Sequence, residues 1–252
     1  AAQQLQALFV EDWKASGGGL LTGAEHFPEL REAGETAVQV IPGGPTYDTD
    51  LLEHAWVAVL NSARERVAIT TPYLVPDQTL LVALRLASLG GARLDLIVPR
   101  ESDSRLSDAA GRTYFDPLLA AGAHVHLFPD GLLHCKSMSA DGLVSVIGSA
   151  NYDRRSLFLN YEANLIVFDR AFTDGLLACQ EKFMGKSREL PRDWWHRRPP
   201  VRKLADQTLK LLGPLLFRAV DHPAAAGRAA GHVAAHPVGE RRSGVIGVDD
   251  RR

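Results

Sequence analysis

Between residues 37 and 186, short runs of β-branched and other apolar residues alternate with longer amphipathic segments. Short apolar runs are typical of buried strands, and apolar positions spaced three to four residues apart are typical of helices. In the first part of this region, strands are predicted at 38–41, 67–71, 94–98 and 125–128, and helices at about 50–66, 80–89 and 104–121. This alternation predicts an α/β sandwich with a largely buried sheet.

The second part of the region has a different pattern. Strands are predicted at 133–138, 144–147 and 165–168 with no helix between them, and a last helix is predicted at 171–186. Strands joined by short connections pair in the antiparallel sense. The sheet is therefore predicted to be mixed, with helices flanking it.

The chain has 252 residues, which is long enough for one well-buried domain with extensions. We divide it into a linker with a closing helix at 1–36, a catalytic domain at 37–190, a basic extension at 191–217 and a disordered tail at 218–252. The amphipathic helix predicted at 1–16 is either the closing helix of an earlier repeat or unrelated to the similar segment near residue 179. Because the chain starts with Ala and has no signal-peptide pattern, we expect it to be part of a longer protein.

Bulk composition excludes some functions. The formal net charge of −2 argues against a globally basic nucleic-acid binder. Two cysteines, Cys135 and Cys179, form no disulfide framework, so a reducing environment fits better. No run of eighteen apolar residues is present that would span a bilayer.

The most informative segment has the pattern H-x-K-x4-D at residues 134–141, followed by G-S-x-N at 148–151 and by Glu162. With roughly 5% usage of each residue type, six fixed positions arise by chance about once in 10⁸ starting sites. In a strand, His134 and Lys136 would share one face, and Cys135 would point the other way as a small core residue. Ser149 and Asn151 share a direction just beyond the neighbouring predicted strand.

An imidazole, an ammonium, a hydroxyl and a carboxamide brought together suit a phosphate group. The lysine charge and the oriented donors neutralise non-bridging oxygens, so neither a metal nor another cofactor is predicted. A neutral histidine can attack phosphorus and form a phosphohistidine, and Glu162 is the candidate acceptor that fixes its tautomer. A general acid is also needed, so a second histidine must come from another chain or from further sequence. Asp141 completes the motif and is grouped with the catalytic residues, although Asp141-Gly142 also reads as a hairpin turn.

The motif and four longer runs of the sequence resemble a known family. The residues 134–141 and 148–151 resemble the HKD signature of the phospholipase D superfamily. The runs TPYLVPD (71–77), LLHCKSMSADG (132–142), GSANYDRRSLFLNYE (148–162) and RRPPVRKLADQTLKLLGPLL (197–216) are similar to the C-terminal half of bacterial cardiolipin synthases. The resemblance implies a phospholipase D-like α/β sandwich with a single HKD repeat. It also implies transfer of a phosphatidyl group from one phosphatidylglycerol to another, with release of glycerol.

Carried onto this chain, the resemblance makes His134 a catalytic histidine and assigns phosphate binding to Lys136, Ser149 and Asn151. It implies a phospholipid substrate, a membrane surface and an N-terminal HKD half or a second copy of the chain as partners. The implied location is the bacterial inner membrane, with this domain attached peripherally. The alternatives are a homodimeric single-HKD phosphodiesterase or endonuclease, although no nucleic-acid partner is expected, and an inactive fragment.

Three features outside the motif each allow two interpretations. Arg154 and Arg155 either hold an anionic headgroup or form structural ion pairs. Trp194 and Trp195 either rest at a membrane interface or pack on the domain. The leucine-bearing segment 203–216 is either a lipid-facing amphipathic helix or a docking helix.

Overall fold

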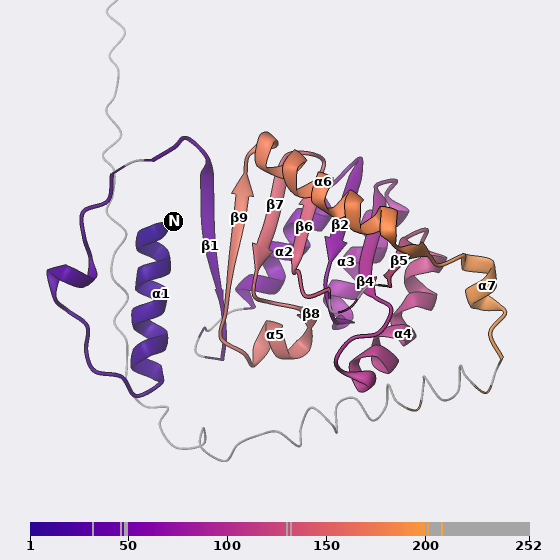
Figure 1. Cartoon of the computed structure of the whole chain (residues 1–252), viewed down its shortest axis with the longest axis horizontal. Helices are drawn as coiled ribbons and strands as arrows, with labels where there is room; N and C mark the ends of the chain where they lie inside the picture. Colours follow the sequence, from indigo (N-terminus) through magenta and orange to yellow (C-terminus); the bar gives the residue numbers. More distant parts are fainter. Residues whose placement is uncertain are drawn as a thin grey trace, which may run out of the picture.

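The main body of the protein is an eight-stranded mixed sheet in the order β1-β9-β7-β6-β2-β4-β5-β10 (Figure 1). The computed structural model describes residues 1–199, 201 and 208, except 32, 46, 48, 49, 130 and 132. The strands are β1 (Ala37–Gly43), β2 (Arg66–Thr70), β4 (Arg93–Pro99), β5 (His124–Phe128), β6 (Ser137–Ala140), β7 (Val144–Gly148), β9 (Glu162–Phe168) and β10 (Arg188–Glu189). Strands β2, β4 and β5 are parallel, and every other pair in this sheet is antiparallel. The predicted mixed α/β sheet is confirmed.

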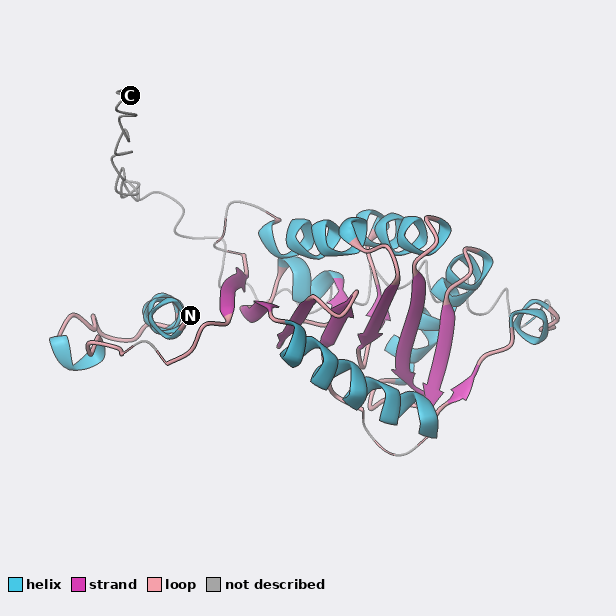
Figure 2. Ribbon diagram, turned by 90° about the horizontal axis from the view of Figure 1, so that it is seen from above, coloured by secondary structure: helices cyan, strands magenta, loops and turns pink. Residues whose placement is uncertain are grey.

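Helices cover both faces of the sheet (Figure 2). They are α1 (Ala2–Ala15), α2 (Leu51–Ser62), α3 (Gln78–Leu89), α4 (Arg105–Ala120), α5 (Arg154–Phe158), α6 (Arg170–Lys186) and α7 (Arg192–His196), with a 3₁₀ turn η1 at Ala24–His26. In Figure 1, α6 crosses in front of the sheet, and α2 and α3 lie behind it. A parallel two-stranded ribbon, β3 (Leu74–Val75) with β8 (Tyr152–Asp153), lies outside the main sheet.

The two faces of the sheet are packed differently. The face toward α2, α3 and α4 belongs to the main apolar cluster, with Ile69, Leu96 and Met138 almost wholly buried. The face toward α6 carries small polar side chains: Ser139 donates to Gln180 Oε1 at 2.6 Å and Ser145 donates to Thr173 Oγ1 at 2.9 Å. These buried polar groups are paired across the interface, which is what burial of a hydroxyl or an amide requires.

Helix α1 and the region around Trp195 lie outside the domain predicted at 37–190. Helix α1 confirms the predicted N-terminal helix, but only Leu8 on it is buried, and Phe9 and Trp13 are about half exposed. Trp195 is buried, 5.3 Å from the ring of Phe115, so this tryptophan packs on the domain, and the side chain of Trp194 lies outside the described residues. The predicted helix at 203–216, apart from residue 208, and the predicted tail at 218–252 lie outside the described residues. Within the described ranges, no helix is both long enough and apolar enough to cross a membrane.

Candidate functional site

The HKD-type motif lies at the edge of the sheet where the parallel strands end. Strand β6 begins at Ser137, opposite Thr70, the last residue of β2. His134 and Lys136 therefore precede β6 and lie at the carboxyl ends of β2, β4 and β5, where open α/β sheets bind their ligands. Helix α5 and strand β8 are at the same end of the sheet (Figure 1).

The predicted strand at 133–138 begins too early. Ladder pairing starts at Ser137, and the Lys136 carbonyl accepts one last hydrogen bond from Gly148 N at 3.3 Å. His134 and Cys135 lie before this contact and are exposed, so the predicted core position of Cys135 is wrong. The apolar residues at the two ends of the predicted strand, Leu133 and Met138, are both buried.

His134 and Lys136 are in direct contact. The Lys136 Nζ atom lies 3.1 Å from His134 Nδ1 and 3.2 Å from His134 Nε2, and it donates to the His134 carbonyl oxygen at 3.0 Å. An exposed imidazole is thus held beside a partly buried ammonium group. This pair offers a nucleophilic nitrogen and a positive charge to the same bound group.

Several acidic groups influence the Lys136 ammonium. Burial lowers the pKa of Lys136, and the charges of Glu162, Cys135, Asp153 and Asp103 act against that shift. Glu162 contributes the largest of these opposing effects. The lysine therefore belongs to one electrostatic cluster with acidic groups from β8, from the start of β9 and from the β4–α4 loop.

Glu162 is buried and its carboxylate is held by Ser149 and Asn160. Ser149 Oγ donates to Glu162 Oε2, and Asn160 Nδ2 donates to Glu162 Oε1 at 3.3 Å. Ser149 Oγ also accepts a hydrogen bond from Ala163 N at 3.0 Å. The predicted Glu162 hydrogen bond to His134 is not among the hydrogen bonds of the described residues, so a role in orienting the imidazole stays a prediction.

The G-S-x-N segment joins β7 to the site through close packing. A Cβ atom at Gly148 would lie 2.2 Å from Asn164 Oδ1, so the neighbouring strand β9 leaves no room for a side chain there. Asn151 Nδ2 donates to Ser156 Oγ at 3.1 Å, and its Oδ1 atom is buried without a hydrogen-bond partner among the described residues. The asparagine amide is therefore anchored to α5, and its role as a phosphate ligand stays a prediction.

Asp141, the last residue of the motif, lies at the other end of β6. Its carboxylate accepts hydrogen bonds from the backbone amides of residues 64, 65 and 66 at 2.7, 3.0 and 2.8 Å. Its φ of 51° is in the left-handed region, as a tight β6–β7 turn requires. Four strand residues separate it from Lys136, about 16 Å along the chain at ~3.3 Å per residue. Asp141 takes the predicted turn position and binds the α2–β2 loop, which argues against grouping it with the catalytic residues.

Three residues at this edge were not predicted from the sequence. The ring of Tyr73 packs edge-on against His134 with centroids 6.4 Å apart, and Tyr73 Oη donates to Asp103. Burial and this hydrogen bond raise the pKa of Tyr73 to about 12. Asp153 is buried and caps α5 by accepting from Ser156 N at 2.8 Å. Tyr73 lies within the quoted TPYLVPD run, which was the only signal in the sequence that pointed to it.

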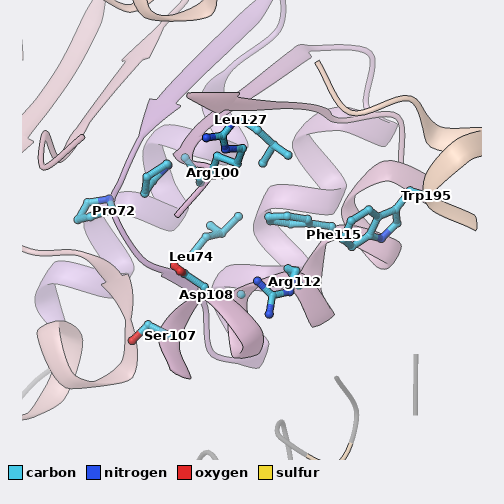
Figure 3. A pocket seen from close by; sticks show the side chains of 12 residues that line it. Pro72, Leu74, Arg100, Ser107, Asp108, Arg112, Phe115, Leu127 and Trp195 are labelled. Carbon is cyan, nitrogen blue, oxygen red and sulfur yellow. The ribbon is translucent and has the colours of Figure 1, made fainter. Parts of the chain in front are cut away.

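A small pocket is lined by Pro72 and Leu74, the residues on either side of Tyr73 in the chain. It has a volume of about 60 Å³, and Figure 3 shows Leu74, Phe115 and Leu127 directed toward its centre. Trp195 closes one side, and Arg100 and Arg112 also line it. The pocket therefore combines an apolar interior with cationic side chains, at the same sheet edge as His134.

Comparison with known proteins identifies the family. A family model described as "Cardiolipin synthase, PLD-like domain" matches residues 56–183. Cardiolipin synthase A of Serratia proteamaculans (strain 568) is 38% identical over 189 residues, which cover 75% of this chain and 39% of the relative. Cardiolipin synthase 1 of Bacillus cereus (strain ATCC 14579) is 34% identical over 225 residues, which cover 86% of this chain and 44% of the relative. The chain thus spans about two fifths of the length of these relatives.

Solved structures share the fold. The phospholipase D family member Nuc from Salmonella typhimurium has a TM-score of 0.53 at 16% identity, over 62% of this chain and 99% of Nuc. Phosphatidylserine synthase from Haemophilus influenzae Rd KW20 has a TM-score of 0.55 at 17% identity, over 73% of this chain and 48% of that one. The family match covers half of the chain, including the strands that flank His134 and Lys136. The chain therefore belongs to the phospholipase D-like domain family of cardiolipin synthases.

Proposed function

We propose that this chain supplies one of two HKD half-sites for cardiolipin synthesis from two phosphatidylglycerol molecules, with release of glycerol. The observation that carries the proposal is the contact of Lys136 Nζ with both ring nitrogens of an exposed His134, at the carboxyl ends of the parallel strands. Family membership and the printed names of the relatives support the choice of reaction.

The reaction is assigned as two displacements at phosphorus. A neutral histidine nitrogen attacks the phosphorus of the first phosphatidylglycerol, and the bond from phosphorus to the glycerol oxygen breaks. A second histidine, from the other half-site, gives its proton to the departing glycerol. The hydroxyl of the second phosphatidylglycerol then attacks phosphorus and loses its proton to that second histidine, while the phosphorus–nitrogen bond breaks. His134 is either the nucleophile or the acid–base group in this scheme.

Phosphate binding is assigned to Lys136, Ser149 and Asn151. Lys136 would neutralise a non-bridging oxygen, because charge-assisted hydrogen bonds to phosphate are stronger than neutral ones. Asn151 has a second amide N–H besides the one bonded to Ser156, and we assign it to another phosphate oxygen. Glu162 is a positioning residue in this proposal, because its charge and its bond to Ser149 fix groups that bind the phosphate.

A lipid substrate requires this edge of the domain to face a bilayer, so we propose peripheral attachment to the bacterial inner membrane. Leu159 and Tyr161 follow α5 at the same edge and are 52% and 44% exposed. Arg154 on α5 is exposed, and its guanidinium lies 5.9 Å from the Phe158 ring. Exposed apolar side chains beside an arginine match an interfacial surface with anionic headgroups.

The test is reconstitution with two substrates. The chain alone, and the chain together with a protein that carries the other HKD half, are offered phosphatidylglycerol micelles and, separately, plasmid DNA. We expect cardiolipin only in the reconstituted sample, and expect it to disappear with His134→Ala in this chain but not with His26→Ala. Nicked DNA from the chain alone would contradict the proposal and support a nuclease instead. Cardiolipin formed equally well with His134→Ala would remove this residue from the mechanism.

A further inference from the structure

A second group of potential ligands lies on the first turn of α2. Asp50, Glu53 and His54 are spaced i, i+3 and i+4, which places them on one helix face. One ligand atom from each lies within 4.8 Å of the other two. None of these residues takes part in the phosphodiester site described above.

Glu53 differs from ordinary surface acids because it is buried. It is 5% exposed, and its Oε1 atom has no hydrogen-bond partner among the described residues. An unpaired buried carboxylate oxygen is costly, so its presence requires a compensating group. The carboxylates of Asp77 and Asp50 lie close enough to act on Glu53 through their charge, so acidic groups are concentrated around this side chain.

The two neighbouring aspartates are held differently. Asp77 caps α3, where its Oδ1 atom accepts from Leu80 N at 2.9 Å. Asp50 occupies the N-cap position of α2, but its side chain makes no capping hydrogen bond. Its carboxylate is therefore not used to cap the helix. One of its oxygens lies within 4.8 Å of a ligand atom of Glu53 and of one of His54.

We propose that Asp50, Glu53 and His54 form a binding site for a divalent metal ion. Two carboxylates and one imidazole are hard and borderline ligands, which favour Mn²⁺ or Zn²⁺ over soft metals. The ion would offset the negative charge that Glu53, Asp50 and Asp77 concentrate at the starts of α2 and α3. These helices pack side by side against the sheet, so the ion would stabilise their N-terminal ends and take no part in phosphodiester chemistry.

Mn²⁺ is the best probe because the chain has two exposed thiols, Cys135 and Cys179, which bind Zn²⁺ and discriminate against Mn²⁺. The untagged chain is titrated with Mn²⁺ and the free ion is followed by electron paramagnetic resonance. We expect one Mn²⁺ per chain with a dissociation constant in the micromolar range. His54→Gln and Asp50→Asn change exposed side chains, so they keep the fold, and each is expected to weaken binding at least tenfold.

The matched control is His124→Gln. His124 Nδ1 lies 2.7 Å from Glu189 Oε1, so it is also a histidine beside an acid, but it belongs to no three-ligand group among the described residues. Unchanged affinity in this control, with the expected loss in His54→Gln and Asp50→Asn, supports the site. The proposal is overturned if the wild-type chain binds no stoichiometric Mn²⁺, or if the control loses as much affinity as the two ligand variants. Glu53→Gln with unaltered affinity would also overturn it. These readouts do not depend on phosphatidyl transfer.

Discussion

The two ends of strand β6 hold charged side chains in opposite ways. At the Ser137 end, Lys136 contacts the exposed imidazole of His134 and senses the charges of Glu162 and Asp103. At the Ala140 end, the Asp141 carboxylate is bonded to three backbone amides of the α2–β2 loop. A group whose partners are backbone amides of another segment holds the fold together. We propose that a group whose main contact is another exposed polar side chain is placed to bind a ligand, so that one motif combines two roles.

The largest effect is expected for His134→Ala. In the reconstituted enzyme it should lower kcat/KM for cardiolipin formation by at least about 10³-fold, because a covalent or acid–base group is lost. Its free energy of unfolding should stay within about 0.5 kcal/mol of the wild-type value, since the side chain is exposed. Turnover assays and urea unfolding on the same preparation check both values. A large loss of stability would mean that His134 also holds the fold together, and the two ends of β6 would then not differ in role.

A smaller loss is expected for Lys136→Met. Removing the ammonium should cost about 10²-fold in kcat/KM, close to 2.7 kcal/mol of transition-state stabilisation. Steady-state kinetics over a range of phosphatidylglycerol concentrations measures it. If only KM rises and kcat is unchanged, Lys136 binds the ground state and the transition state equally, and its assigned role in stabilising charge at phosphorus is wrong.

Particular residues explain why the sequence predicted the fold well and the site only in part. Apolar spacing located the strands that become β2, β4 and β5, because their burial on both faces leaves a strong pattern. The two-residue strands β3 and β8 are too short to leave any periodicity. The H-x-K spacing placed His134 and Lys136 together through strand alternation, and the structure joins them before the strand begins.

The partners of the motif residues depend on long-range contacts that spacing does not encode. Asp141 bonds to residues about 75 positions earlier in the chain, and Tyr73 reaches His134 from the end of another strand. Glu162 is directed to Ser149 because both flank the β7–β9 connection. The buried Glu53 leaves no signal in the sequence, since an Asp-x-x-Glu-His run at a helix start looks like an ordinary solvated first turn.

The third prediction concerns Asp141, which follows the Ala140 end of β6. Asp141→Ala removes three hydrogen bonds to backbone amides and places Ala at a φ of 51°, so it should lower the free energy of unfolding by about 2 kcal/mol. Urea unfolding followed by circular dichroism measures this. Turnover per folded molecule should change less than about threefold. A variant that is as stable as the wild type but inactive would return Asp141 to the catalytic group.

The smallest effect is a pH dependence of stability. Burial would raise the pKa of Asp141, but the hydrogen bonds from the amides of Arg66, Arg64 and Glu65 lower it below its ordinary value of 3.8. A lowered folded-state pKa means that the stabilisation is complete well above pH 3.8 and is lost as the pH falls through the folded-state value. The stability difference between wild type and Asp141→Asn, about 1 kcal/mol at pH 7, should therefore shrink in acid. A difference that grows as the pH falls would contradict the sign of this shift.

The separation of the two ends is tested most directly by a double-mutant cycle. The log of kcat/KM per folded molecule is measured for Lys136→Met, Asp141→Asn and the double variant in the reconstituted enzyme. Because the two residues are about 16 Å apart along the backbone at ~3.3 Å per residue, and their side chains share no hydrogen-bond partner among the described residues, we predict that their effects add to within about 0.5 kcal/mol. A coupling energy above about 1 kcal/mol would show that both residues act in one site, and would contradict the division of β6 into a ligand-binding end and a structural end.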